Sequence, residues 1–135
     1  MGFDEHAEKF PAGMSAYFQL RWKPSSLWGL ELEPKLGNVQ SFDWHLDYPF
    51  WSTQPPEPLF DLCPNEVLSN PTRYASHWNR FNEADLNCPL HVTDVNSSLV
   101  ILDGIHRLAK LVYLGECDLQ FYVVPNEFLI AVEAR

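Results

Sequence analysis

The amino-acid sequence predicts a compact α+β domain, in which helices pack on a small mixed sheet. From Leu90 onward the chain reads as two short apolar strands, an amphipathic helix and a further strand, an order typical of α+β and mixed α/β proteins. The 135 residues are 46% hydrophobic and 20% charged, which are the values of an ordinary globular chain with one core. We therefore expect one domain over residues 1–135.

The N-terminal part, residues 1–58, is rich in tryptophan and proline. A short helix is predicted at Asp4 to Phe10, and an edge strand at Leu27 to Glu33, which prolines bound on both sides. Residues Ser41 to Tyr48 alternate apolar and polar side chains, the period of a half-buried strand. Residues Pro49 to Pro58 contain too much proline for a helix or central strand and predict a rigid loop. With its aromatic residues, this loop could wall a pocket or simply pack in the core.

On the predicted strand at 41–48, Asp43, His45 and Asp47 share one face. Two carboxylates and an imidazole at this spacing could bind a metal ion. The same pattern is expected of any solvated strand face, and no fourth ligand follows from the sequence. We therefore favour a solvated face and predict no metal site.

The central part, residues 59–125, carries the clearest elements. Pro64 begins a short helix through Leu68, and Thr72 to Glu83 form a second helix. Its apolar stripe contains His77, which we interpret as a histidine at the edge of the core rather than a ligand; the stripe comprises Tyr74, His77, Trp78 and Phe81. Leu90 to Val95 and Ser98 to Leu102 predict a hairpin turning at Asn96-Ser97.

A helix is predicted to begin after Gly104 and to end at Gly115. Leu119 to Val124 follow as a β-branched and aromatic strand that Pro125 stops. In the C-terminal segment, residues 126–135, the stretch from Glu127 to Ala134 fits either a helix or a strand.

The junction between strand and helix, Asp103 to Arg107, is the candidate functional site. The first N–H groups of a helix lack intrahelical partners, and with the helix dipole they favour an anion. Gly104 permits close backbone approach, with Ile105 beside it, and Arg107 can fork onto a phosphate. His106 can move a proton, and Asp103 can hold Mg²⁺ or act as a base. The alternative interpretation is structural: Asp103 caps the helix, Arg107 pairs with a surface acid and His106 is merely exposed.

Two motifs in this order resemble those of the ParB/sulfiredoxin superfamily. Leu-Asp-Gly-Ile-His-Arg-Leu-Ala at 102–109 is similar to its glycine-to-arginine junction, and Asn-Pro-Thr-Arg at 70–73 is similar to its Asn-Pro-x-Arg box. The resemblance covers about residues 59–125. It implies a compact α+β domain in which Gly104, His106 and Arg107 face a nucleotide or phosphate, with Arg73 entering from the first box.

Departures from the family pattern narrow the activity. Sulfiredoxin chemistry needs a cysteine where this chain has Ile105, and none of the three cysteines adjoins the motif in sequence, so that activity is excluded. Relatives with Asp-Gly-His-His-Arg, including kinase-like members, resemble the chain most, although Ile105 replaces their first histidine. If that histidine is needed for transfer, this chain would only bind.

We therefore expect a cytoplasmic protein, without membrane contact, that binds a phosphorylated small molecule or a nucleotide such as ATP with Mg²⁺. Phosphoryl transfer or hydrolysis would require Asp103 or His106. The alternative is a non-catalytic module that uses its tryptophans, Trp22, Trp28, Trp44 and Trp51, as a protein-partner surface. A ParB-like nuclease ranks third, because a net charge of −9 with nine scattered basic residues argues against nucleic-acid binding.

Overall fold

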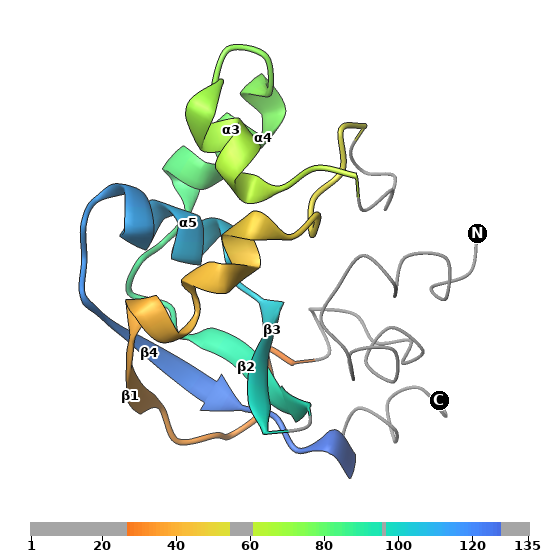
Figure 1. Ribbon diagram of the computed structural model, residues 1–135. Coiled ribbons are helices and arrows are strands. Elements are labelled where there is room, and N and C mark those ends of the chain that lie inside the picture. Colours follow the sequence, from red (N-terminus) through yellow and green to blue (C-terminus); the bar gives the residue numbers. More distant parts are fainter. Residues whose placement is uncertain (1–26, 55–60, 96, 128–135) are drawn as a thin grey trace.

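Figure 1 shows the fold of the computed structural model, which describes residues 27–54, 61–95 and 97–127. In these residues, four strands form one mixed sheet in the order β1-β4-β2-β3. The strands are β1 (Lys35–Asn38), β2 (Leu90–Val95), β3 (Ser98–Asp103) and β4 (Asp118–Val123). β4 runs parallel to β2, whereas the pairs β1–β4 and β2–β3 are antiparallel. Together with the helices, this sheet confirms the α+β fold class.

The helices lie on one face of the sheet (Figure 1). They are α3 (Pro64–Ser69), α4 (Ala75–Glu83) and α5 (Ile105–Tyr113), with the 3-10 helices η2 (Val39–Ser41) and η3 (Asp43–Asp47) beside them. The main core between the layers includes Val39, Phe42, Trp51, Val67, Phe81, Leu90, Val92, Ile101, Leu108 and Phe121. Residues from both sides of position 58 contribute to this core, so the described N-terminal residues are part of the same fold.

The central elements were predicted correctly. α3 begins at Pro64, and α5 ends at a glycine in the left-handed conformation, Gly115, whose φ is +76°. There the N–H of Gly115 donates to the carbonyl of Val112, and that of Glu116 to Leu111, which closes the last turn. The second helix starts at Ala75, later than predicted, because positions 71–74 form a turn. The hairpin and β4 also lie where the sequence predicts them.

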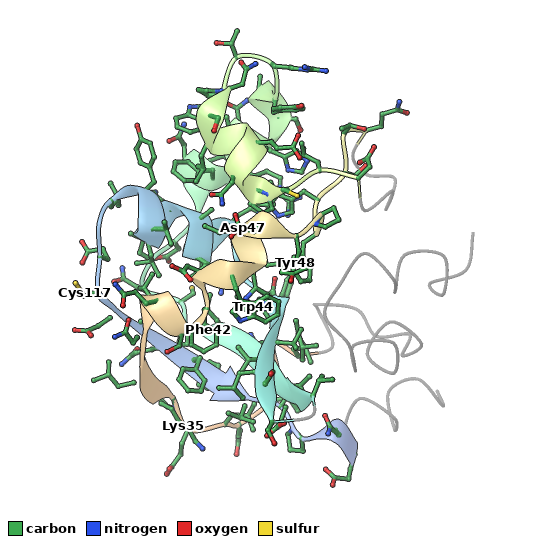
Figure 2. All side chains as sticks on the ribbon, viewed as in Figure 1. Lys35, Phe42, Trp44, Asp47, Tyr48 and Cys117 are labelled. Carbon is green, nitrogen blue, oxygen red and sulfur yellow. The ribbon has the colours of Figure 1, made fainter. Side chains whose placement is uncertain are left out.

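The predicted strand at 41–48 is wrong, because these residues form a 3-10 turn and the helix η3. The N–H groups of Phe42, His45 and Tyr48 each donate to a carbonyl three residues earlier. The buried side chains Val39, Phe42 and His45 are therefore spaced by three, the period of a 3-10 helix. Figure 2 shows the resulting arrangement, with Phe42, Trp44 and Tyr48 labelled on these turns.

His45 consequently does not share a solvated face with Asp43 and Asp47. Its side chain is fully buried, whereas both carboxylates are exposed. The three side chains therefore do not form the solvated face that the spacing predicts, because His45 lies in the core and the two aspartates lie at the surface.

The predicted edge strand at 27–33 is also wrong. Residues 27–29 form a turn, and the chain then runs unpaired to Pro34, after which β1 pairs with β4. Leu27 is fully buried because it packs on Leu102 and Val124, in a small cluster separate from the main core. Leu30 and Leu32 pack against the same cluster, so the loose alternation in the sequence reflects the burial of these leucines and not a strand. Gly37 of β1 lies under the ring of Phe121, where a Cβ would approach the ring to 2.7 Å.

Some predictions fall outside the described residues. These are the helix at Asp4 to Phe10, Trp22, residues 55–60 of the proline-rich loop, and all but the first residue of the segment from Glu127 to Ala134. No helix in the described part of the chain is long and apolar enough to cross a membrane.

His45 connects η3 to the edge strand β3. Its Nδ1–H donates to the carbonyl of Phe42 at 2.7 Å, and its Nε2 accepts from the backbone N–H of Ile101 at 3.0 Å. The bond from Ile101 requires a neutral ring, because a protonated Nε2 could not accept, whereas the bond to Phe42 can form in either charge state. Burial lowers the pKa of His45 from 6.5 to about 4, although the bond to Phe42 opposes this shift.

This burial predicts an acid-labile fold. Below pH 6.5 the unfolded chain takes up a proton at His45 that the folded chain does not bind until about pH 4, so His45 alone lowers the unfolding free energy over this window by about 3 kcal/mol. Denaturant unfolding at several pH values measures the slope. His45→Gln should remove about one proton from this dependence, and a slope equal to the wild-type slope would contradict the assignment.

Candidate functional site

The candidate site lies where β3 runs directly into α5. Gly104 occupies the N-cap position of α5 with a φ of +115°, and no side chain at this position accepts a hydrogen bond from the helix. A Cβ at this position would lie 2.6 Å from Leu90 Cδ2 and 3.1 Å from Arg107 Nη1. Two features therefore favour glycine at this position: the left-handed backbone, and the Leu90 and Arg107 side chains that fill the space of a Cβ. The first N–H groups of α5 receive no acceptor from the cap residue.

Arg107 and Asp103 are held by protein contacts at this junction. Arg107 Nη1 donates to the carbonyl of Pro89 at 2.8 Å, and its Nη2 lies 3.6 Å from Asp103 Oδ2. The indole N–H of Trp28 also donates to Asp103 Oδ2, at 3.1 Å. Asp103 is therefore not the helix cap of the alternative interpretation. The Arg107 side chain remains partly exposed, at 19%.

An open cleft of about 310 Å³ lies beside the start of α5, between it and the end of α4. It is lined by Arg80, Glu83, Ala84, Asp85, Cys88, Asp103, Gly104, His106 and Arg107. Two arginines therefore face three carboxylates in the same cleft. The carboxylates would repel an anion that binds alone. With a divalent cation, the phosphate would face the arginines and the cation would face the carboxylates.

His106 belongs to an aromatic stack behind this cleft. Its ring lies 4.1 Å from that of Trp51 with an interplanar angle of 14°, and His77 stacks on the same indole at 4.8 Å and 4°. The two histidines are hydrogen-bonded, with His77 Nδ1 3.2 Å from His106 Nε2. His77 Nε2 in turn lies 2.6 Å from the carbonyl oxygen of Ser52.

The stack keeps both histidines neutral at physiological pH. Burial, with smaller contributions from the charge of Arg80 and from His77, lowers the pKa of His106 to about 3. Burial also lowers the pKa of His77, against the opposing effect of its bond to Ser52. His106 is therefore a weak base that keeps a lone pair available at pH 7, rather than a cation that could pair with phosphate.

The structure brings together Asp103, Gly104, His106 and Arg107 at one cleft. Ile105 contributes its backbone to the same turn, while its side chain packs against the core. Arg73 is exposed, and its contacts lie away from the junction. Its guanidinium lies 5.4 Å from the ring centre of Tyr74, and its backbone N–H donates to Asn70 Oδ1. Among the described residues, no hydrogen bond or ion pair connects Arg73 to the junction.

No protein-family model, curated protein or solved structure matches the chain. The resemblance to the ParB/sulfiredoxin superfamily stays a prediction that rests on its two motifs. The geometry of the cleft is therefore the basis for function.

Sequence reasoning missed several residues of the site. The sequence predicts His77 at the edge of the core, and it is indeed buried, but it also forms a hydrogen bond with His106. Its place on the inner stripe of α4 could have suggested a contact with another helix. Cys88 lines the cleft although it is distant from the motif in sequence, whereas Cys117 lies on the connection between α5 and β4 (Figure 2). Arg80, one turn after His77, carried no sequence signal of its own.

His91 is a further group near the junction that the sequence did not single out. It faces Asp103 across the β2–β3 register, and its Nδ1 is the buried side-chain atom that lacks a hydrogen-bond partner in the described part of the chain. Burial lowers its pKa, while Asp103 raises it and Arg107 lowers it.

The conformation of Gly104 gives a direct prediction. Gly104→Ala should lower the unfolding free energy by about 2–3 kcal/mol, because alanine is strained at this φ and its Cβ meets Leu90. Gly29→Ala is the matched control, since a Cβ there has no heavy atom within 4 Å. Chemical denaturation measures both, and equal stabilities of the two variants would contradict the described junction.

Proposed function

We propose that the chain binds a nucleotide or a phosphorylated small molecule, together with Mg²⁺, at the start of α5. The observation that carries the proposal is the cleft in which uncapped N–H groups of α5 adjoin Arg107, Arg80 and three carboxylates. Helix N-termini and arginine forks are the usual ligands of phosphate, and carboxylates are those of Mg²⁺.

The charges of the cleft support a metal-bound phosphate over a free one. Glu83, Asp85 and Asp103 outnumber the two arginines, and Asp103 already pairs with Arg107. The donor set fits Mg²⁺, which commonly takes one or two protein carboxylates and completes its shell with phosphate oxygens and water. When bound, the ion would neutralise phosphate charge beside these carboxylates. The residues that would contact phosphate are Arg107, Arg80 and the first N–H groups of α5.

Binding is tested with Mg-ATP by calorimetry. Arg107→Gln should weaken the affinity about tenfold, the effect of losing a hydrogen bond to a charged group. Lys35→Gln is the matched control, because it removes one positive charge from exposed strand β1, and it should change the affinity less than about twofold.

Arg107 also donates to the carbonyl of Pro89, so its loss could disturb the fold. Arg80→Gln gives a second measurement, because Arg80 lines the cleft and its side chain makes no hydrogen bond to the backbone within the described residues. Arg73→Gln tests the contribution of the first box. Affinities that are equal in wild type, Arg107→Gln and Arg80→Gln, or no binding by wild type, would refute the proposal.

Turnover distinguishes an enzyme from a binding module. Asp103→Asn should lower phosphate release or transfer at least about hundredfold, because an amide neither accepts a proton nor carries the charge that Mg²⁺ requires. If the affinity of this variant for Mg-ATP is unchanged, Asp103 acts as the base. If the affinity is lost, Asp103 is a ligand of the metal ion. Unchanged release of phosphate would remove Asp103 from the reaction, and binding without any release by wild type would favour the non-catalytic module.

The structure limits the alternative of a tryptophan-rich partner surface. Trp51 is buried in the main core under the two histidines, and Trp44 stacks on His45 at 3.7 Å. Among the described tryptophans, Trp28 is the one that is largely exposed, at 67%, and its indole N–H is engaged by Asp103.

A further inference from the structure

The hydrogen bonds of the histidine pair determine where its protons lie. His77 Nε2 lies 2.6 Å from the carbonyl oxygen of Ser52. A carbonyl only accepts hydrogen bonds, so Nε2 carries the hydrogen. In a neutral imidazole the other nitrogen, Nδ1, is then an acceptor.

The position of the hydrogen on His77 determines the position of the hydrogen on His106. Its Nε2 lies 3.2 Å from the accepting Nδ1 of His77, so His106 Nε2 must donate. Burial keeps both rings neutral, as their lowered pKa values indicate. The hydrogen of His106 therefore lies on Nε2, and its Nδ1 carries a lone pair.

The lone pair is available to a ligand. Within residues 27–54, 61–95 and 97–127, His106 Nδ1 forms no hydrogen bond. It is also not a fully buried atom, because the buried side-chain atom that lacks a partner in these residues is His91 Nδ1. His106 itself lines the cleft beside Arg107 and Asp103. The stacking of both imidazoles on Trp51, nearly parallel to it, hinders the ring flip about Cβ–Cγ that would replace Nδ1 by Cδ2 and Nε2 by Cε1 and so break these hydrogen bonds.

We infer that His77 is a positioning residue that holds His106 with its Nδ1 lone pair available to the cleft, so that the site prefers a phosphorylated ligand with a hydroxyl near its phosphate. A lone pair accepts a hydrogen bond from O–H but repels an anionic phosphate oxygen. His106 thus contacts the hydroxyl, and Arg107 with the helix N–H groups contacts the phosphate. This inference rests on the proposed function.

A metal ion is the competing occupant of this lone pair, because a ligating histidine commonly donates its other N–H to a protein acceptor. The hydroxyl is favoured here because Mg²⁺, the ion of the proposed function, takes oxygen ligands rather than an imidazole nitrogen. Metal binding at His106 is therefore an outcome of the experiment.

The tautomer is tested first, without any ligand. Long-range ¹H–¹⁵N spectra at pH 7 distinguish protonated from unprotonated ring nitrogens, and His106 should carry its hydrogen on Nε2. His77→Gln should preserve this state, since its amide can donate to Ser52 and accept from His106. His77→Phe keeps a ring on Trp51 but loses both hydrogen bonds, and His106 should then populate both tautomers. A hydrogen on Nδ1 in the wild-type protein overturns the inference.

The ligand preference is tested by calorimetry with glycerol 3-phosphate and propyl phosphate, both with Mg²⁺. Glycerol 3-phosphate should bind about fivefold more tightly to wild type and to His77→Gln, the size of one hydrogen bond. This ratio should fall to about one in His77→Phe, while the affinity for propyl phosphate changes little.

The outcomes separate the two proposals. Equal affinities of wild type for the two phosphates, or binding of Mg-ATP without either of them, overturn the hydroxyl preference and leave the proposed function standing. No binding of Mg-ATP or of either phosphate refutes both. A coordination shift of the His106 Nδ1 signal on addition of Zn²⁺ without phosphate identifies a metal site at this lone pair and overturns the role assigned to the hydroxyl.

Discussion

The fold depends on a backbone constraint at Gly104. The chain passes from β3 into α5 through one left-handed residue, and Leu90 of the neighbouring strand closes the space that a side chain would need. This turn sets the direction of α5 across the sheet and thereby positions His106 and Arg107. Arg107 strengthens the same arrangement by bonding the carbonyl of Pro89, immediately before β2. The residues of the candidate site are thus also those that join the two layers.

Burial decides the chemistry of this junction more than the motif itself does. An Asp-Gly-x-His-Arg segment on an exposed turn would present a histidine that titrates near neutral pH and a freely mobile arginine. In this protein Trp51 and His77 cover one side of His106, and Asp103 is fixed by Trp28 and Arg107. The site therefore offers fixed hydrogen-bonding groups and a nearly balanced set of charges, which suits a metal-bound phosphate better than a bare anion.

The sequence was informative where local rules decide the structure. Pro64 and Gly115 bound their helices as expected, and the apolar runs of β2, β3 and β4 were evident because sheet burial selects such residues. The failures came from tertiary contacts. The stretch from Val39 to Leu46 follows a period of three because its side chains fill the core over the sheet, and a two-residue alternation in the sequence imitated a strand. Leu27 is buried by residues more than seventy positions away, which no local pattern reveals.

The same division applies to the site. Asp103, Gly104, His106 and Arg107 could be grouped from the sequence because they lie within one turn. His77, Arg80, Cys88 and Trp51 join them only through the packing of α4, of the segment between α4 and β2, and of the Trp51–Leu62 bridge. Arg73, placed by the motif alone, has its described contacts within its own turn.

The central claim is that the start of α5 receives the phosphate. Backbone ¹H–¹⁵N chemical shifts during titration with Mg-ATP test it most directly, because the signals of amides that donate a hydrogen bond to a phosphate oxygen shift strongly. The account predicts that the largest changes occur at Ile105, His106 and Arg107 and saturate together. Changes centred on other elements, or none at millimolar Mg-ATP, would contradict it.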